Sequence, residues 1–390
     1  MYVTRPLSVY WKHPEALSEA PPAGPGSGYL VIQDEEAQNF CCFGLCKDSQ
    51  LYNFPFPQNK DLTVRYTENH GDSSTVYNDG VFMIPVIGQP LSSNQYYVIR
   101  RHGKHKGEAH GNSTEEDKGT CLCFRYVRDK KPRPLDPNDM YQKFIIYPRE
   151  TICGFGGFHA KSVAPDGYPP RFLKRKGWTL HGKTPKNFFL DDDAQGVNDS
   201  QRSKLPSLDF PIDRKSSDPA VVGKWYCPFM FVKDGDVGDQ IKTSAFYEMT
   251  LQQRWEQVHV CENHASEGNA VGVDVLVQKE AITVFGEEAG EGDVSDGVVW
   301  FRSRRGVIGL GMAIVERMRW EEERVGWVKE GEKRGRVKRA EEFIKSGLSE
   351  NWKRFGCYVL VESFVLKRMD KTLVLAYDFM HTHQVRSKWE

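Results

Sequence analysis

Short runs of β-branched and aromatic residues, broken at close intervals by glycine or proline, constrain this chain more than any other feature of its sequence. Its 390 residues include 35 glycines and 21 prolines. Runs of this kind have the length of strands, and the turn residues between them interrupt long helices. Strands and helices do not alternate regularly, which argues against a parallel sheet. The sequence therefore predicts an α+β fold that is strand-dominated, with mainly antiparallel sheets, few short helices and two domains.

The apolar runs place individual strands along the chain. We expect strands at residues 28–33, 62–66, 81–86, 95–101 and 121–128, and again at 221–226, 230–232, 246–260, 271–277, 282–285 and 298–301. In the segment 246–260, Tyr247 and Met249 alternate with Glu248 and Thr250, which predicts one packed face and one face in water. Residues 336–346 carry apolar side chains at helical spacing and predict a short helix.

A change in composition divides the chain. Residues 191–220 begin with three consecutive aspartates and contain few apolar residues in register, which is typical of a linker. We expect a strand-rich N-terminal domain over residues 1–190, ending in a proline-rich connector, and a strand-rich C-terminal domain over residues 221–390. Three similar triplets occur in the second domain: Arg254-Trp255-Glu256, Arg319-Trp320-Glu321 and Lys388-Trp389-Glu390. If they mark a repeat, the domain contains related strand units; the alternative is a chance match, because three-residue matches arise easily.

Charge and cysteine content bear on the compartment and on partners. Lys plus Arg and Asp plus Glu each number 53, so no net field draws the chain to nucleic acid or anionic lipid. The first residues lack the apolar run of a secretory signal, and nine cysteines, an odd number, favour reduced thiols. No apolar run approaches the roughly 20 residues that span a bilayer. We expect a protein of the cytoplasm, with the nucleus as an alternative, that is not secreted.

Several longer motifs carry a resemblance to a known family. They are MYVTRPLS at residues 1–8, SGYLVIQDEE at 27–36, FPFPQNK at 54–60, VAPDG at 163–167, GKWYCPF at 223–229 and SKWE at 387–390. Together these motifs resemble the plant family catalogued as domain of unknown function 1262, sometimes labelled insecticidal crystal toxin domain. The likeness extends over essentially the whole chain.

The resemblance implies a land-plant origin and a role in stress or defence. It carries no activity, substrate, cofactor or catalytic residue over to this chain. One departure lies in the turn Met369-Asp370-Lys371, where the family pattern has Asp-Gly. A lysine in place of that glycine predicts a turn without a positive φ at this position.

The most concentrated positive stretch is the basic loop, residues 100–107. Its glycines would let backbone amides approach a phosphate or sulfate, so it is the predicted anion-binding site. The candidate residues are Arg100, Arg101, His102, Lys104, His105 and Lys106. The alternative is a solvated loop whose charge is balanced by the acidic residues at 115–117.

Cysteines and histidines offer two arrangements that resemble metal sites. Cys41, Cys42 and Cys46 would need to meet Cys121 and Cys123 in space, and their spacing does not match a zinc motif. His381 and His383 lie on one face of a strand, but no third ligand can be identified from the sequence. We therefore expect no metal and no cofactor, with the cysteines as small buried side chains and the histidines in structural roles.

No nucleophile or phosphate-binding motif of the common enzyme classes is present. This favours a non-catalytic binding or interaction protein, in which aromatic residues such as Trp225, Tyr226 and Trp300 contact an unknown protein or small-molecule partner. The alternative is an enzyme of an uncommon class that holds an anionic substrate at the basic loop. A third class, membrane disruption, would need a releasable amphipathic hairpin, and none is evident in the sequence. The sequence indicates no oligomeric state.

Overall fold

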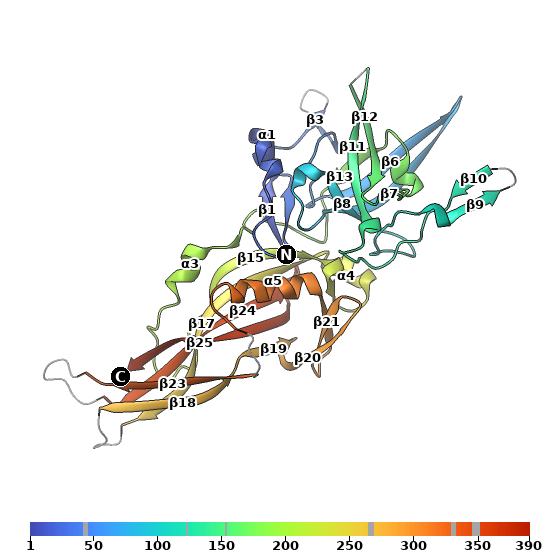
Figure 1. Ribbon diagram of the computed structural model, residues 1–390. Helices are drawn as coiled ribbons and strands as arrows, with labels where there is room; N and C mark the ends of the chain where they lie inside the picture. Colours follow the sequence, from blue (N-terminus) through green and yellow to red (C-terminus); the bar gives the residue numbers. More distant parts are fainter. Residues whose placement is uncertain (42–45, 122–123, 153, 264–268, 329–332, 345–351) are drawn as a thin grey trace.

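The computed structural model describes the chain from Met1 to Glu390 except for residues 42–45, 122–123, 153, 264–268, 329–332 and 345–351 (Figure 1). Strands dominate it, and most pair antiparallel, which confirms the predicted fold class. Strand β1 (Tyr2–Pro6) runs parallel to β2 (Gly28–Ile32). Of the helices in the described residues, none is long and apolar enough to cross a membrane.

The larger sheet combines both ends of the chain. Its path runs through β16 (Val232–Lys233), β22 (Val307–Gly311), β21 (Val298–Arg302), β20 (Glu287–Ser295), β19 (Glu280–Val284), β25 (Leu373–Trp389), β24 (Arg354–Lys367), β17 (Phe246–Glu262), β15 (Ala220–Pro228), β1 and β2. Strand β14 (Gly196–Val197) also pairs with β15. The first strands of the chain thus lie in the same sheet as the last.

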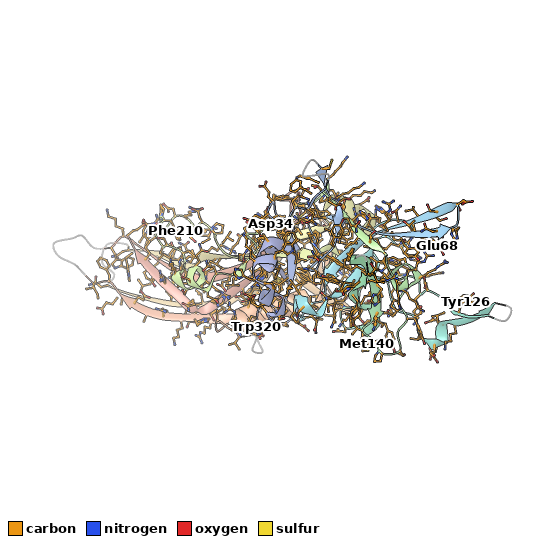
Figure 2. The ribbon with its side chains drawn as sticks, turned by 90° about the horizontal axis from the view of Figure 1, so that it is seen from above. Asp34, Glu68, Tyr126, Met140, Phe210 and Trp320 are labelled. Carbon is orange, nitrogen blue, oxygen red and sulfur yellow. The ribbon has the colours of Figure 1, made fainter. Side chains whose placement is uncertain are left out.

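The second sheet contains seven strands from the N-terminal half. Its order is β12 (Gly154–Ser162), β11 (Lys143–Thr151), β8 (Gln95–Arg100), β7 (Ser73–Pro85), β6 (Asp61–His70), β13 (Thr179–Lys183) and β5 (Gln50–Leu51). Two hairpins project from the end of the molecule that holds the seven-stranded sheet (Figure 1). They are β6–β7, and β9 (Lys118–Cys121) with β10 (Phe124–Val127). Figure 2 shows their residues Glu68 and Tyr126 at the end opposite Phe210.

Helices are few and short, as the sequence predicts. They are α1 (Leu7–Lys12), α2 (Arg171–Lys174), α3 (Asp199–Lys204), α4 (Val237–Thr243) and α5 (Met312–Glu323). Single 3-10 turns occur at η1 (Pro14–Ser18), η3 (Leu91–Ser93), η4 (Glu115–Asp117), η5 (Met140–Gln142) and η6 (Phe229–Phe231). The longest helix, α5, was not predicted; it lies against the larger sheet (Figure 1).

The two sheets share one apolar core. Phe82 and Ile99 of the seven-stranded sheet belong to the same buried cluster as Tyr2 and Phe229 of the other part. A second, separate cluster lies within the seven-stranded sheet around Trp178. The division into two domains at residues 191–220 stays a prediction. If the chain is divided there, the two domains pack against each other through this shared core. Of the three proposed repeat triplets, two lie in strands and the middle one lies in α5.

Residues 336–346 do not begin a helix, so that prediction is wrong. Strand β23 (Arg334–Glu342) pairs antiparallel with β18 (Ala270–Gln278), and residues 345–346 lie outside the described residues. Val337 and Val273 are buried against Phe355, while Arg336 bonds Asp274 on the outer face. Long-range pairing outweighs the helical spacing here. The result is an amphipathic two-stranded ribbon, although β18 and β23 are not consecutive and do not form a hairpin.

Three finer predictions also need correction. Glu248 of β17 does not meet water: it is 9% exposed and its carboxylate pairs with Lys224 and Lys371. Lys371 has a φ of 69°, so the turn does require a positive φ at the position where glycine was expected. Trp225 and Tyr226 are each 1% exposed and form part of the core, so they cannot present a surface to a partner.

Candidate functional site

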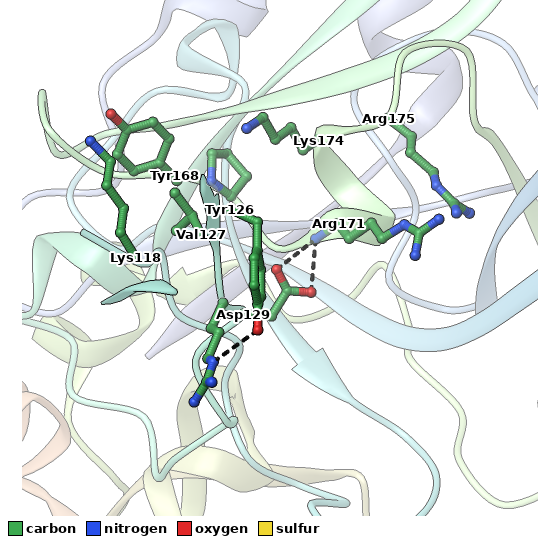
Figure 3. Close-up of a pocket in the computed structure, with 10 residues that line it drawn as sticks. Lys118, Tyr126, Val127, Asp129, Tyr168, Arg171, Lys174 and Arg175 are labelled. Atoms are coloured by element: carbon green, nitrogen blue, oxygen red, sulfur yellow. Dashed lines mark hydrogen bonds between the residues drawn. The ribbon is translucent and has the colours of Figure 1, made fainter. Parts of the chain in front are cut away.

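A hollow of about 860 Å³ lies between the base of the β9–β10 hairpin and helix α2 (Figure 3); we call it the basic groove. Five of its ten lining residues are cations and one is a carboxylate. The cations are Lys118, Arg128, Arg171, Lys174 and Arg175, and the carboxylate belongs to Asp129. Tyr126 and Tyr168 contribute aromatic walls. The groove therefore presents an excess of positive charge to solvent.

The local sequence explains why these side chains meet. Strand β10 ends at Val127, and the chain leaves it through Arg128 and Asp129. Helix α2 begins after Pro169 and Pro170, whose rings prevent an earlier helical start. Both carboxylate oxygens of Asp129 accept from the backbone N–H of Arg171, at 3.1 and 3.0 Å. Asp129 thus fastens the first turn of α2 to the base of the hairpin.

Tyrosine rings support three of the cations. The guanidinium carbon of Arg128 lies 6.0 Å from the centroid of the Tyr126 ring, and Lys174 Nζ lies 5.4 Å from that of Tyr168. Arg175 lies over the rings of both Tyr66 and Tyr77, at 4.7 and 4.4 Å. Such contacts hold a cation in place without neutralising its charge.

The cations of the groove differ in how far carboxylates balance them. Lys118 pairs with Glu115 at 2.5 Å, and Arg175 pairs with Glu68 at 3.4 Å. Within the described part of the chain, no carboxylate lies within ion-pair distance of Arg128, Arg171 or Lys174. These three side chains keep their charge available to a ligand.

A second hollow of about 260 Å³, the side hollow, adjoins the groove and shares Asp129, Arg171 and Arg175 with it. It adds Arg100 and Lys130 as further cations, the carboxylate of Asp79, and His110. Lys130 also pairs with Asp117 at 3.1 Å, so among the described residues Arg100 is the cation that this hollow adds without an ion pair. Burial, together with the charges of Arg100 and His105, lowers the pKa of His110 to about 4. At neutral pH this imidazole is therefore uncharged.

The basic loop predicted as an anion site is largely occupied by contacts within the protein. Arg101 pairs with Asp61 at 2.6 Å, and His105 Nδ1 lies 2.7 Å from a carboxylate oxygen of Glu108. Burial, followed by the charge of Arg101, lowers the pKa of His102. These contacts divert two of the six candidate side chains away from solvent anions.

Of the six candidates, only Arg100 lines either of the two hollows. Lys104 is exposed, and Lys106 extends toward α4, where its Nζ would lie 3.2 Å from a Cβ placed on Gly238. The structure thus does not bring the six residues to a common point, although anion binding by the loop stays a prediction.

The predicted cysteine groups lie in separate parts of the fold. Cys42 and Cys123 are outside the described residues. Cys41 and Cys46 face each other in the small β3 (Phe40–Cys41) and β4 (Cys46–Lys47) sheet, and Cys121 ends β9 in a different sheet. Figure 1 shows the two sheets well apart. The described strands that carry Cys41 and Cys46 therefore belong to a different sheet from the strand of Cys121, and the predicted meeting of Cys42 with Cys123 lies outside the described residues.

A buried charge cluster lies between α3, α5 and the larger sheet. Arg202 of α3 donates to Glu362 of β24, with Nε 2.9 Å from Oε1, and its Nη2 lies 3.2 Å from Glu322 of α5. His381 of β25 places Nε2 2.8 Å from Glu322 and 3.4 Å from Glu362. Each of these side chains is at most 5% exposed. The sequence offered no ligand to join His381, and the structure supplies two carboxylates from distant segments.

Ligand atoms of Glu322, Glu362 and His381 all lie within 4.8 Å of one another, which is a donor set that a zinc-type ion accepts. Charge balance argues against an ion. Three arginines, Arg202, Arg317 and Arg324, pair with the three glutamates of this cluster, Glu321, Glu322 and Glu362, and Arg324 also pairs with a fourth carboxylate, Asp199. One proton on His381 closes that balance, whereas a divalent ion would exceed it. We interpret the cluster as a structural ion-pair network; the absence of a metal stays a prediction.

The protonation of the cluster follows from its geometry. Burial alone would lower the pKa of His381, but its contacts with Glu322 and Glu362 outweigh burial and raise the pKa to about 9. Burial would raise the pKa of Glu362, yet hydrogen bonds from His381 and Arg202 hold it below its ordinary value. Burial raises the pKa of Glu322. The His381–Glu322 pair therefore keeps one proton at neutral pH.

The groove residues were not predicted as a site. The signal that could have indicated them is the run Arg171-Phe172-Leu173-Lys174-Arg175-Lys176, which has four cations in six residues directly after two prolines. The other half of the groove, Lys118 to Asp129, comes from a hairpin whose position relative to that run depends on tertiary contacts.

By its fold, the chain is a strand-rich protein in which two large, mainly antiparallel sheets share a core and three two-stranded sheets are added among the described residues. A family model described as "Protein of unknown function (DUF1262)" matches residues 23–124, about a quarter of the chain, and this segment includes Lys118 but not Arg171. The crystal structure of Cry35Ab1 is similar, with a TM-score of 0.43 and 12% sequence identity over 86% of this chain and 90% of that one. No curated protein matches the sequence.

Proposed function

We propose that this protein is a non-catalytic binding protein that takes an anionic ligand in the basic groove. The observation that carries the proposal is the set Arg128, Arg171 and Lys174, three cations that face one hollow without a carboxylate partner among the described residues. A hollow lined by one sign of charge concentrates ligands of the opposite sign. Its volume of about 860 Å³ suits a small organic anion.

The chemistry of the lining favours binding over catalysis. Among the ten described lining residues there is no serine, cysteine or histidine that could act as a nucleophile or a neutral base. Both oxygens of the Asp129 carboxylate already accept from the backbone N–H of Arg171, so this side chain has a structural role in the groove. We therefore assign the groove to recognition.

The proposal includes the cytoplasm as the compartment and a role in plant stress or defence. The second part rests on the resemblance of the sequence motifs alone. The first part rests on the cysteine content, because nine cysteines, an odd number, favour reduced thiols.

Calorimetric titration with pyrophosphate tests the proposal. In the double variant Arg171→Gln/Lys174→Gln, the affinity should fall about tenfold or more, because two charged donors are lost. The matched control is Arg336→Gln/Lys338→Gln, which removes the same charge from β23 at the far end of the molecule (Figure 1). Equal losses in both double variants, or no binding to the unmodified protein, would contradict the proposal.

A further inference from the structure

The groove and the side hollow together place cations on both sides of Asp129. Arg128 and Lys174 line the groove alone, whereas Arg100 and Lys130, with the carboxylate of Asp79, line the side hollow alone. Asp129 lines both hollows, and Figure 3 shows its carboxylate between Lys118 and Arg175. A ligand that reaches from one hollow into the other passes the three residues that line both, Asp129, Arg171 and Arg175, of which only Asp129 is anionic.

Asp129 restricts what such a ligand can carry at its middle. An anionic group against this carboxylate would be repelled, and an apolar group would cover its oxygens without bonding them. Each oxygen already accepts from the N–H of Arg171, yet a carboxylate offers about four acceptor positions. Hydroxyl groups can donate to the positions that are left.

The aromatic walls limit the ligand further. One face of the Tyr126, Tyr168 and Tyr77 rings already carries Arg128, Lys174 and Arg175, respectively. Single-stranded nucleic acids bind by stacking bases on open aromatic faces. Partly covered rings, together with several guanidinium groups, favour compact oxyanions over bases, since guanidinium binds phosphate and sulfate oxygens in pairs.

Resting on the proposed function, we infer that the ligand is a phosphorylated or sulfated polyol with two anionic groups, one for each hollow, and a hydroxyl-bearing middle that bonds to Asp129. Arg171, which lines both hollows, contacts either anionic group. Asp129 then selects polyols from other dianions of the same length.

The test compares two ligands of equal charge and length, mannitol 1,6-bisphosphate and hexane-1,6-diol bisphosphate, by calorimetric titration. The hydroxylated compound should bind at least about tenfold more tightly to the unmodified protein, because several hydroxyl–carboxylate bonds add to the same ionic contacts. In Asp129→Asn the ratio of the two affinities should fall to within about threefold, since a neutral amide accepts more weakly. The measured quantity is the ratio of the two affinities and not either affinity alone. Asp129→Asn removes a negative charge and therefore strengthens the binding of both bisphosphates.

A second variant tests the two-ended arrangement. Arg100→Gln/Lys130→Gln should weaken mannitol 1,6-bisphosphate about tenfold and leave mannitol 1-phosphate, which fills one hollow, within about twofold. Replacing the phosphates by sulfates distinguishes the two oxyanion sources. Equal affinity for both bisphosphates in the unmodified protein would overturn the inference while leaving the proposed function intact, provided that Arg171→Gln/Lys174→Gln still weakens them. If neither compound binds, the proposed function itself fails.

Discussion

Arg202 and Glu362, 160 residues apart in the sequence, form a buried ion pair in which Nε of the arginine lies 2.9 Å from Oε1 of the glutamate. The pair joins α3 to β24, and Gln253 of β17 donates to the same carboxylate at 2.7 Å. Helix α5 joins the network through Glu322. The network thus attaches two helices to the centre of the larger sheet.

Removing Arg202 should be strongly destabilising. Arg202→Met leaves Glu322 and Glu362 buried without their main cation, and we expect the free energy of unfolding to fall by about 3–5 kcal/mol. Urea unfolding followed by tryptophan fluorescence measures the change. The control is Arg214→Met, whose exposed pair with Asp218 should contribute little to the free energy of unfolding, because solvent screens it. Similar losses in the two variants would show that the buried network is not a main source of stability.

His381 predicts a loss of stability at alkaline pH. Its pKa is about 9 in the folded chain and about 6.5 in the unfolded chain. The stabilisation is therefore complete below pH 6.5 and is lost as the pH rises through 9. The free energy of unfolding should fall by about 3 kcal/mol between pH 6 and 9.5. This figure describes the loss of the single proton that His381 shares with Glu322, so no separate contribution from Glu322 is added to it. In His381→Gln this part of the slope should be missing; an unchanged slope would refute the assignment.

His110 predicts the opposite behaviour on the acid side. Its folded pKa of about 4 lies below the unfolded value, so the unfolded chain takes up a proton that the folded chain refuses. The free energy of unfolding should fall by about 3 kcal/mol as the pH drops from 6.5 toward 4, and His110→Asn should flatten this part of the profile.

An anion in the side hollow should also raise the pKa of His110 by offsetting the charge of Arg100. Titration of the imidazole by NMR with and without pyrophosphate measures this effect, and no upward shift would place the anion elsewhere.

Gly107 predicts a close approach between the basic loop and α4. Its φ is +84°, and a Cβ there would lie 2.4 Å from Cγ2 of Val237. Gly107→Ala should therefore cost both backbone strain and a steric clash, about 2–4 kcal/mol in all. Gly88 has a φ of +74° but no atom within 4 Å of an added Cβ, so Gly88→Ala should cost only about 1 kcal/mol. Equal thermal shifts in the two variants would argue against tight packing of the loop on α4.

The sequence predicted strands well where local alternation and burial agree. The segments 28–33, 95–101 and 246–260 coincide with β2, β8 and β17 within a few residues, and 81–86 covers only the C-terminal part of β7 (Ser73–Pro85). It failed at 336–346, where Val337 fits a helical spacing and a strand spacing equally, and pairing with β18 decides between them. It also missed α5, whose inner face carries the charged residues Arg317 and Glu322. Arg317 pairs with Glu321 of the same helix, but the partners of Glu322 come from α3 and β25, which no local pattern reveals.

The candidate site shows the same limit. The basic loop stands out in the sequence because its cations are consecutive, yet Arg101 and His105 pair with Asp61 and Glu108 in the folded chain. The groove joins two stretches about 45 residues apart, and the bond from Arg171 to Asp129 brings them together. Charge density along the chain thus identifies cations, whereas ion pairing decides which of them stay available.

Locating a bound anion tests the central claim most directly. Crystals soaked in selenate, a tetrahedral dianion with an anomalous signal, should show a peak within hydrogen-bond distance of the Arg171 guanidinium and Lys174 Nζ. That peak should disappear in Arg171→Gln/Lys174→Gln crystals. Selenate bound only at other surfaces, with the groove between α2 and the β9–β10 hairpin empty at saturating concentration, would contradict the account.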